Sequence, residues 1–295
     1  MKNNKFSLLG TTFDAFNYLI LTLFMILCIY PFYYVFIYSI SNPQLAYKGV
    51  YLLPQGVTLF NYIKVFQIQS IFTATYITVL RTVIGTVVSL LCCALFAYIL
   101  TKKEMYLRSL IYRGLVLTMY LGAGLIPYYI VIRSLGLRNN FLVYIIPGAI
   151  NAFFVILIKT SIEQIPAALE ESAMIDGAGY FTTFVKVIFP LIQPICATIV
   201  VFSAVGQWNS WFDTYIFTSN KALSTLQYIL LNMLNDSAAT ATYLNRDSIN
   251  MKVKTLTPQS IKMTITMVTM IPILLIYPFA QKYFLKGIML GAIKG

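Results

Sequence analysis

Carboxylates are scarce in this chain, and nearly half of them lie close together. Four of the nine Asp and Glu residues fall between positions 163 and 176, namely Glu163, Glu170, Glu171 and Asp176. Grouped carboxylates form charge-assisted hydrogen bonds with basic side chains and favour helix N-termini. The segment is therefore predicted to bind a basic surface on a soluble partner. The alternative is an interfacial turn that touches only lipid headgroups, which an anionic leaflet disfavours.

A second group of polar and aromatic side chains lies further along, at Gln207, Trp208, Asn209 and Trp211. Amides hydrogen-bond hydroxyl groups and aromatic faces pack on C–H surfaces, so this group has the chemistry of a sugar-lined path. For the two tryptophans the alternative is the membrane interface, where Trp is enriched. The two amides avoid lipid and favour an inward face.

Several kinds of chemistry are excluded by what the chain lacks. It has no histidine, and its four cysteines lie in apolar runs without a CxxC pair, so no metal site is expected. Histidine-dependent catalytic sets cannot form, and no GxxxxGK[ST] phosphate loop is present. The sequence thus predicts a non-catalytic chain that binds no cofactor itself.

The composition places these residues in a membrane protein. The 295 residues are 59% hydrophobic and 10% charged, with a mean hydropathy of +0.78, whereas a soluble domain carries about 25% charged residues. The net charge of +12 comes from basic residues scattered between apolar runs, so nucleic-acid binding is not expected. We predict an all-α membrane protein that forms one helical bundle in the lipid bilayer.

Six apolar runs are long enough to cross a bilayer core of about 30 Å. Six spans place both termini on one side, and Lys and Arg in the short loops favour the cytoplasm for that side. The prediction is a cytoplasmic segment 1–15, a transmembrane domain 16–281, a cytoplasmic tail 282–295 and a cytoplasmic loop 159–186. The spans are predicted at 16–40, 72–100, 114–132, 141–158, 187–212 and 263–281.

The cytoplasmic loop contains residues that typically begin and end two short helices. Pro166 suits a first helical turn, residues 167–175 favour a helix, and Gly177 can adopt a positive φ. Residues 180–189 can restart as a second helix that continues into the fifth span. The two helices would form a knob that projects from the membrane.

Arg81 is the one charge inside the second apolar run. We expect it either to extend to the membrane interface or to pair with a carboxylate or carbonyl of a partner subunit, rather than to contact a transported solute.

The knob resembles the cytoplasmic signature of permease subunits of ABC importers. That signature is Glu-Ala-Ala, three residues, Gly, nine residues, then Ile-x-Leu-Pro. In this chain it stands as Glu171-Ser172-Ala173, Gly177 and 187–190 ending in Pro190. Ser172, Val187 and Phe189 depart from the simplest pattern but keep size or apolarity. Segments 121–127, 135–137, 207–211 and 277–295 are similar to the permeases for oligosaccharides and polysaccharides of Gram-positive bacteria.

The resemblance implies a six-helix, maltose-type permease in the plasma membrane of a bacterium, with a coupling helix seated on an ATPase. The implied partners are a second, distinct permease that completes a heterodimer, two ATPase subunits that hold ATP and Mg, and an extracellular solute-binding lipoprotein for a carbohydrate. A permease for peptides or amino acids and a membrane scaffold without a pore are the alternatives. The implied coupling residues are Glu170, Glu171, Ser172, Ala173, Asp176, Gly177, Ala178 and Pro190.

Overall fold

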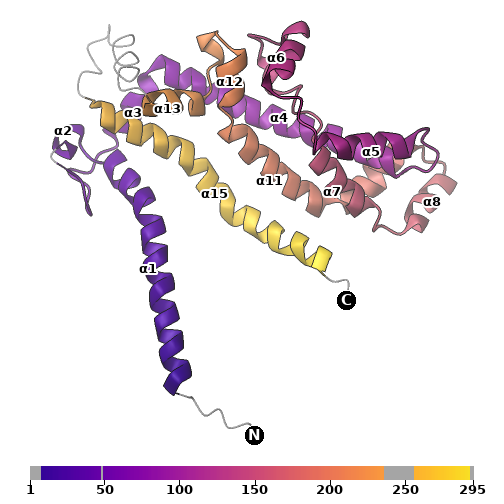
Figure 1. Ribbon diagram of the computed structural model, residues 1–295, viewed down its shortest axis with the longest axis horizontal. Helices are drawn as coiled ribbons and strands as arrows, with labels where there is room; N and C mark the ends of the chain where they lie inside the picture. The colour runs from indigo at the N-terminus through magenta and orange to yellow at the C-terminus, as the bar shows by residue number, and fades with distance from the viewer. Residues whose placement is uncertain (1–7, 48, 236–255, 293–295) are drawn as a thin grey trace. The chain divides into compact units, whose positions relative to one another are not determined.

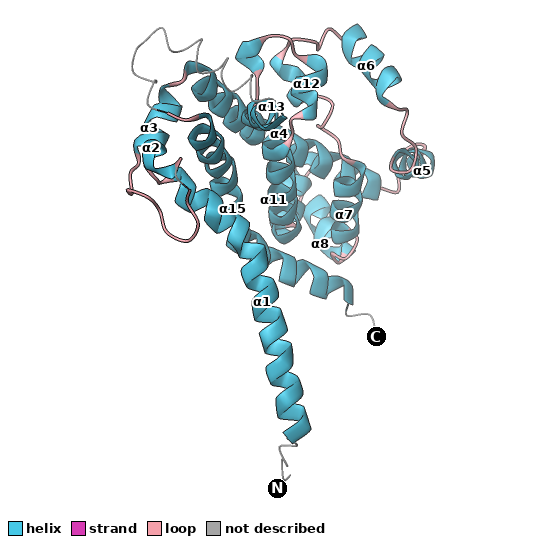
Figure 2. Ribbon diagram, turned by 60° about the vertical axis from the view of Figure 1, so that its left-hand side comes forward, coloured by secondary structure: helices cyan, strands magenta, loops and turns pink. Residues whose placement is uncertain are grey.

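The computed structural model describes residues 8–47, 49–235 and 256–292, which divide into two compact units. The described residues are helical apart from loops and one isolated antiparallel bridge between Ser41 and Val57 (Figures 1 and 2). The predicted cytoplasmic segments 1–15 and 282–295 fall in part outside the described residues. The first unit covers residues 1–68 and 236–268, and the second covers 69–235 and 269–295.

The first unit contains α1 (Leu8–Ser39), α2 (Pro43–Ala46), α3 (Phe60–Gln67) and the start of α15 (Pro258–Ala292). The Asn61 side chain donates to the carbonyls of Ser39 and Ser41 at 2.8 and 2.7 Å, which fixes the end of α1 against α3. Most of α1 is exposed among the described residues, since only 6% of the residues in an 18-residue apolar window of its Phe13–Ser39 segment are buried. Apolar side chains exposed over such a length require lipid or another subunit.

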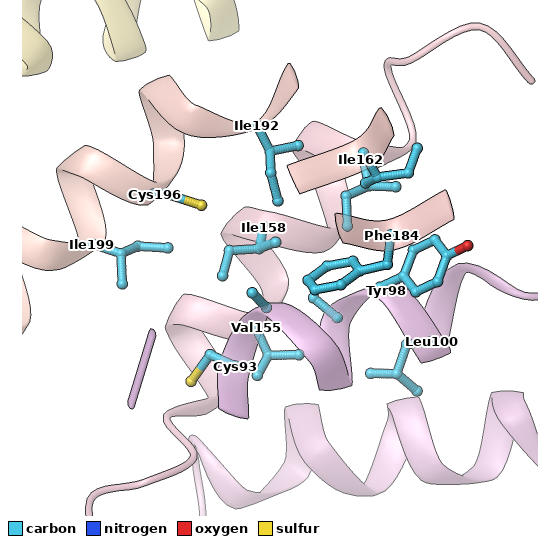
Figure 3. Close-up of a cluster of buried hydrophobic side chains, with 13 residues drawn as sticks. Cys93, Tyr98, Leu100, Val155, Ile158, Ile162, Phe184, Ile192, Cys196 and Ile199 are labelled. Atoms are coloured by element: carbon cyan, nitrogen blue, oxygen red, sulfur yellow. The ribbon is translucent and has the colours of Figure 1, made fainter. Parts of the chain in front are cut away.

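The second unit is built on three packed helices, α4 (Gln69–Thr101), α7 (Ala152–Ile162) and α11 (Gln193–Asn209). Figure 3 shows their shared apolar core, in which Ile158 and Ile199 are fully buried. Small residues of α4, including Ala94 and Ala97, are fully buried and let the neighbouring helices approach closely. This core holds α4 in place between two regions that carry polar side chains.

Shorter helices complete the second unit (Figure 1). They are α5 (Arg108–Thr118), α6 (Leu125–Ser134), α8 (Ala167–Ile175), α9 (Tyr180–Thr183), α10 (Phe189–Leu191), α12 (Phe212–Phe217) and α13 (Leu226–Asn235), with 3₁₀ turns at Phe141–Tyr144 and Lys221–Leu223 and a π-helical turn at Phe184–Ile188.

The described helices match the predicted spans only in part. Three are long and apolar enough to cross a membrane: Phe13–Ser39, Gln69–Thr101 and Pro258–Pro278. The number rises to five if two bent helix pairs each count as one span. The predicted first, second and sixth spans therefore correspond to continuous helices, whereas the other three are interrupted.

The predicted third span, 114–132, is broken between α5 and α6. Gly124 has φ 81°, a conformation that favours glycine, and it begins α6 without a side-chain cap. Pro127 lies in the first turn of α6, where its missing N–H is tolerated. Hydropathy did not reveal the break because the residues on both sides of it are apolar.

The predicted fourth span, 141–158, is also not one helix. The 3₁₀ turn at Phe141–Tyr144 is followed by Pro147 and Gly148, and α7 begins only at Ala152. The Asn151 side chain caps α7 by accepting a hydrogen bond from the Phe154 N–H at 3.2 Å.

The predicted fifth span, 187–212, contains a sharp bend. Segments Tyr180–Leu191 and Gln193–Asn209 meet at 82°, next to the π-helical turn. Pro190 and Pro194 flank the bend, each in the first turn of its helix, α10 or α11, and neither has an N–H that could continue the helix across it. The chain thus turns from the knob into α11 rather than continuing straight.

Candidate functional site

A buried guanidinium lies where α4, α11 and α12 meet. Arg81 is 1% exposed, and its Nη2 donates to Asp213 Oδ2 at 2.8 Å. Nε and Nη2 also donate to Gln207 Oε1 at 3.1 and 3.0 Å, and Nη1 donates to the Ser210 carbonyl at 3.3 Å. The guanidinium carbon lies 4.4 Å from the centre of the Tyr144 ring. Burial without hydrogen-bonded partners would be costly, so these contacts are what permit the charge.

The position of the Arg81 side chain differs from both expectations drawn from the sequence. The side chain does not extend to an interface, so that alternative is wrong. It does pair with a carboxylate, but with Asp213 of its own chain rather than with a group of a partner subunit.

A cavity of about 300 Å³ adjoins this ion pair. Its wall combines hydroxyl, amide and aromatic side chains, which is the mixture that orients a small polar ligand. The lining residues from α4 and the following segments include Arg81, Ser89, Tyr128, Tyr144, Asn151, Phe154, Phe202, Ser203, Gln207 and Asp213.

The four predicted path residues make different contacts. Gln207 lines the cavity, where its amide NH₂ also donates to the Tyr144 carbonyl at 3.3 Å. The Trp208 indole donates instead to the Thr269 carbonyl at 2.9 Å, and Asn209 accepts from the Gln227 side chain at 3.0 Å. Trp211 packs edge-on against Phe212. Of the four, Gln207 alone is among the residues that line this cavity.

A glycine of α4 makes room for the Gln207 side chain. A Cβ added at Gly85 would lie 2.7 Å from the Gln207 amide nitrogen, closer than non-bonded atoms approach. We expect Gly85→Ala to push Gln207 away from Arg81 and to lower the free energy of unfolding by about 1–3 kcal/mol. Denaturation of the detergent-solubilised protein measures the change. Gly206→Ala is the matched control because a Cβ there meets nothing within 4 Å, and equal losses in the two variants would contradict the packing argument.

The predicted knob is present and has a defined end. Helix α8 covers Ala167–Ile175, and Gly177 has φ 86°. The Gly177 N–H donates to the Met174 carbonyl at 3.0 Å and the Ala178 N–H donates to the Ala173 carbonyl at 2.9 Å. This pair of bonds is a Schellman motif, which requires the left-handed conformation that glycine adopts most readily. Helices α7 and α8 meet at 79°, so α8 turns away from the bundle.

Two of the four clustered carboxylates bind basic groups of their own chain. Glu170 accepts hydrogen bonds from Lys102 and from the Tyr98 hydroxyl, the latter at 2.7 Å. Glu163 accepts from Lys159 at 2.6 Å and lies 3.6 Å from Arg108. These pairs tie the knob to the last turn of α4 and to the start of α5.

Burial lowers the pKa of the Lys102 ammonium to about 8, while the Glu104 carboxylate acts in the opposite sense. The direct contact with the Glu170 carboxylate favours the charged form of the Lys102 ammonium.

The other two clustered carboxylates remain on the surface. Glu171 and Asp176 are exposed and make no ion pair with another described residue. Exposed apolar side chains lie beside them, including Ile175 at 86% and Phe181 at 70%. Of the remaining predicted coupling residues, Ser172, Gly177 and Pro190 are exposed, and Ala173 and Ala178 are partly buried. The knob therefore offers a mixed acidic and apolar surface.

The sequence contained no local signal for most of these tertiary pairs. Arg81 and Asp213 are 132 positions apart, and Tyr98 and Glu170 are 72 apart. A rule that charges inside apolar runs find partners could have linked Arg81 to Asp213, the single carboxylate beside the fifth predicted span.

Known proteins resemble the chain over nearly its whole length, although no family model matches it. The polygalacturonan/rhamnogalacturonan transport system permease protein YtcP of Bacillus subtilis is 35% identical over 285 residues, which is 96% of this chain and 98% of YtcP. Protein LplC of the same organism is 35% identical over 287 residues, covering 97% of this chain and 96% of LplC.

The chain is also similar to a protein of known structure. A crystal structure of a bacterial ABC transporter involved in the import of the acidic polysaccharide alginate contains a chain that matches with a TM-score of 0.83 and 29% identity. The match covers 96% of this chain and 100% of that one. On the similarity to YtcP and the shared fold, the chain belongs to the family of permease proteins of bacterial carbohydrate ABC transporters.

Proposed function

We propose that this chain is one of two permease subunits of an ATP-driven importer and forms half of the path for an oligosaccharide. The proposal rests on one observation: helix α4 joins the polar cavity to the acidic knob. The polar cavity lies beside Arg81 in the first half of α4, and the acidic knob is bound to Tyr98 and Lys102 at the end of this helix. A movement of the knob can therefore reach the cavity through α4.

The substrate class rests on the cavity and on the relatives. Hydroxyl, amide and aromatic groups in the wall suit a sugar ring. YtcP is named for polygalacturonan and rhamnogalacturonan, and the solved transporter imports alginate. The break between α5 and α6 supports a path next to these two helices, because non-helical backbone at membrane depth must be buried in protein or face water.

Coupling would take place at the knob. Glu171 and Asp176 are free to meet basic groups or helix N-termini of an ATPase, and Ile175 and Phe181 supply apolar contact. Ser172, Ala173, Gly177, Ala178 and Pro190 would set the shape of this surface. Glu170 would act indirectly, since it binds Tyr98 and Lys102 within the chain.

The assembly would contain a second permease, two ATPase subunits that hold ATP and Mg, and an extracellular solute-binding lipoprotein. This chain would lie in the plasma membrane of a Gram-positive bacterium, with both termini and the knob in the cytoplasm. It would perform no covalent chemistry itself.

Photo-crosslinking from the knob tests the assignment. A benzophenone amino acid at Ile175 is expected to crosslink to an ATPase subunit in membranes, whereas the same probe at the exposed Lys221, in a 3₁₀ turn that packs on α4 away from the knob, is not. ATP-dependent uptake of labelled oligosaccharides by the same membranes should exceed uptake of peptides and amino acids. Uptake of peptides or amino acids alone would point to another solute, and the absence of both crosslink and uptake would leave a scaffold.

A further inference from the structure

The cavity beside Arg81 is lined by one positive and one negative side chain. Arg81 and Asp213 are the charged side chains among the described residues that line it, and they neutralise each other across 2.8 Å. The two are not equally accessible, however. Arg81 has 2% of its side chain exposed and Asp213 has 29%, so a ligand in the cavity meets the carboxylate rather than the guanidinium.

The guanidinium has little hydrogen-bonding capacity left. Four of its five N–H groups are donated within the chain: two to Gln207, one to Asp213 and one to the Ser210 carbonyl. A carboxylate on a ligand could form the usual bidentate contact with Arg81 only by displacing Asp213 or Gln207. The ion pair therefore does not offer an anion site.

Asp213 lines the cavity and retains an acceptor that no described residue uses. Its Oδ2 accepts from both Arg81 and Ser210, each at 2.8 Å, whereas Oδ1 has no hydrogen-bond partner among the described residues. The Asn151 amide NH₂ likewise has no hydrogen-bond partner among the described residues, while its Oδ1 caps α7. One open acceptor and one open donor suit a ligand that carries hydroxyl groups.

Building on the proposed oligosaccharide importer, we infer that this cavity selects an uncharged, hydroxyl-bearing sugar unit and disfavours a uronate, with Asp213 as the residue that determines the selection. The volume of about 300 Å³ lies at the small end of the range for ligand pockets, about 300–1,000 Å³, which suits a single ring. Tyr128 and Phe154 provide apolar wall for its C–H face. A uronate would bring a second carboxylate toward Asp213 in a partly desolvated space, and like charges so placed repel.

A matched pair of ligands isolates the charge. Trisaccharides of galactose and of galacturonate differ only at C6, where CH₂OH replaces the carboxylate. We expect the purified transporter in lipid nanodiscs, without the solute-binding protein, to bind the galactose trisaccharide at least tenfold more tightly in equilibrium dialysis. Equal or tighter binding of the galacturonate trisaccharide by the unmodified transporter would overturn the inference.

Charge variants then assign the effect to Asp213. Asp213→Asn gives the cavity a net positive charge and should shift the preference toward the uronate. Arg81→Gln should strengthen the preference for the neutral sugar, and the double variant Arg81→Gln/Asp213→Asn, which has no ionised group, should reduce the difference to less than threefold. Asp14→Asn, at an exposed position of α1 outside the cavity and the knob, is the control and should leave the preference unchanged. A preference that stays the same in the double variant overturns the role of Asp213, even if a single variant fails to fold.

ATP-dependent uptake separates this inference from the proposed function. Uptake of either trisaccharide combined with tighter binding of the uronate overturns only the inference. Failure of uptake with both trisaccharides and with other labelled oligosaccharides overturns the importer assignment, and the inference with it.

Discussion

Asp213→Ala is expected to destabilise the folded protein by about 3–5 kcal/mol, because it leaves the buried Arg81 guanidinium without its counter-ion. The neighbouring contacts cannot compensate, since the Gln207 side chain and the Ser210 carbonyl are already hydrogen-bonded to Arg81. Denaturation of the detergent-solubilised protein, followed by loss of helical signal, measures the change in the free energy of unfolding.

A second variant distinguishes loss of the ion pair from loss of packing. Replacing both partners by apolar residues of similar volume, as in Arg81→Met/Asp213→Leu, removes the unpaired charge and should restore most of the stability. Asp176→Ala removes an exposed carboxylate and should change the free energy of unfolding by less than about 0.5 kcal/mol. If the double variant loses as much as the sum of Arg81→Met and Asp213→Leu measured separately, the two side chains are not energetically coupled.

Gly177→Pro is expected to reduce ATP-dependent uptake at least tenfold while the chain still inserts into the membrane. Proline fixes φ near about −65°, whereas Gly177 has φ 86°, and proline also lacks the N–H that Gly177 donates to the Met174 carbonyl. Both effects abolish the Schellman motif and redirect the chain between α8 and α9, so the proposed ATPase contact loses its shape. Parallel measurements of uptake, ATP hydrolysis and membrane content separate loss of coupling from loss of protein.

The same substitution two positions later provides the comparison. Gly179 has φ −74°, within the range of proline, so Gly179→Pro should retain most of the uptake. Charge reversal at Glu171 should act in the same direction as Gly177→Pro, because it places a base where the proposed partner is basic. Normal uptake in both Gly177→Pro and Glu171→Lys would contradict coupling through the knob.

Features with short-range causes could be predicted from the sequence. Pro166 and Gly177 mark the ends of α8, and the predicted helix 167–175 has the bounds that the structure has. The long apolar runs likewise become α1, α4 and α15. In each case the signal lies within a few residues of the element that it specifies.

Features that depend on distant residues could not be predicted in the same way. Hydropathy treats Gly122 to Gly124 as part of a span, although the third predicted span breaks there. The partners of Arg81 and Glu170 belong to other helices, and composition does not reveal which helices pack together. Of the residues predicted to line a sugar path, Gln207 lines the cavity, whereas Trp208 and Trp211 make other contacts.

The length of α4 has a mechanical consequence. Arg81 and Thr101, its last residue, are separated along it by about 30 Å at 1.5 Å per residue, which is about the thickness of the hydrocarbon core. Because α4 packs against α7 and α11 through buried residues between Cys93 and Leu100, close to Lys102, it can behave as a lever that pivots near that end and carries a displacement of the knob to Arg81. Such a lever transmits both tilt and rotation. One residue added between its ends would rotate them by about 100° relative to each other, and the two ends would no longer face their partners together.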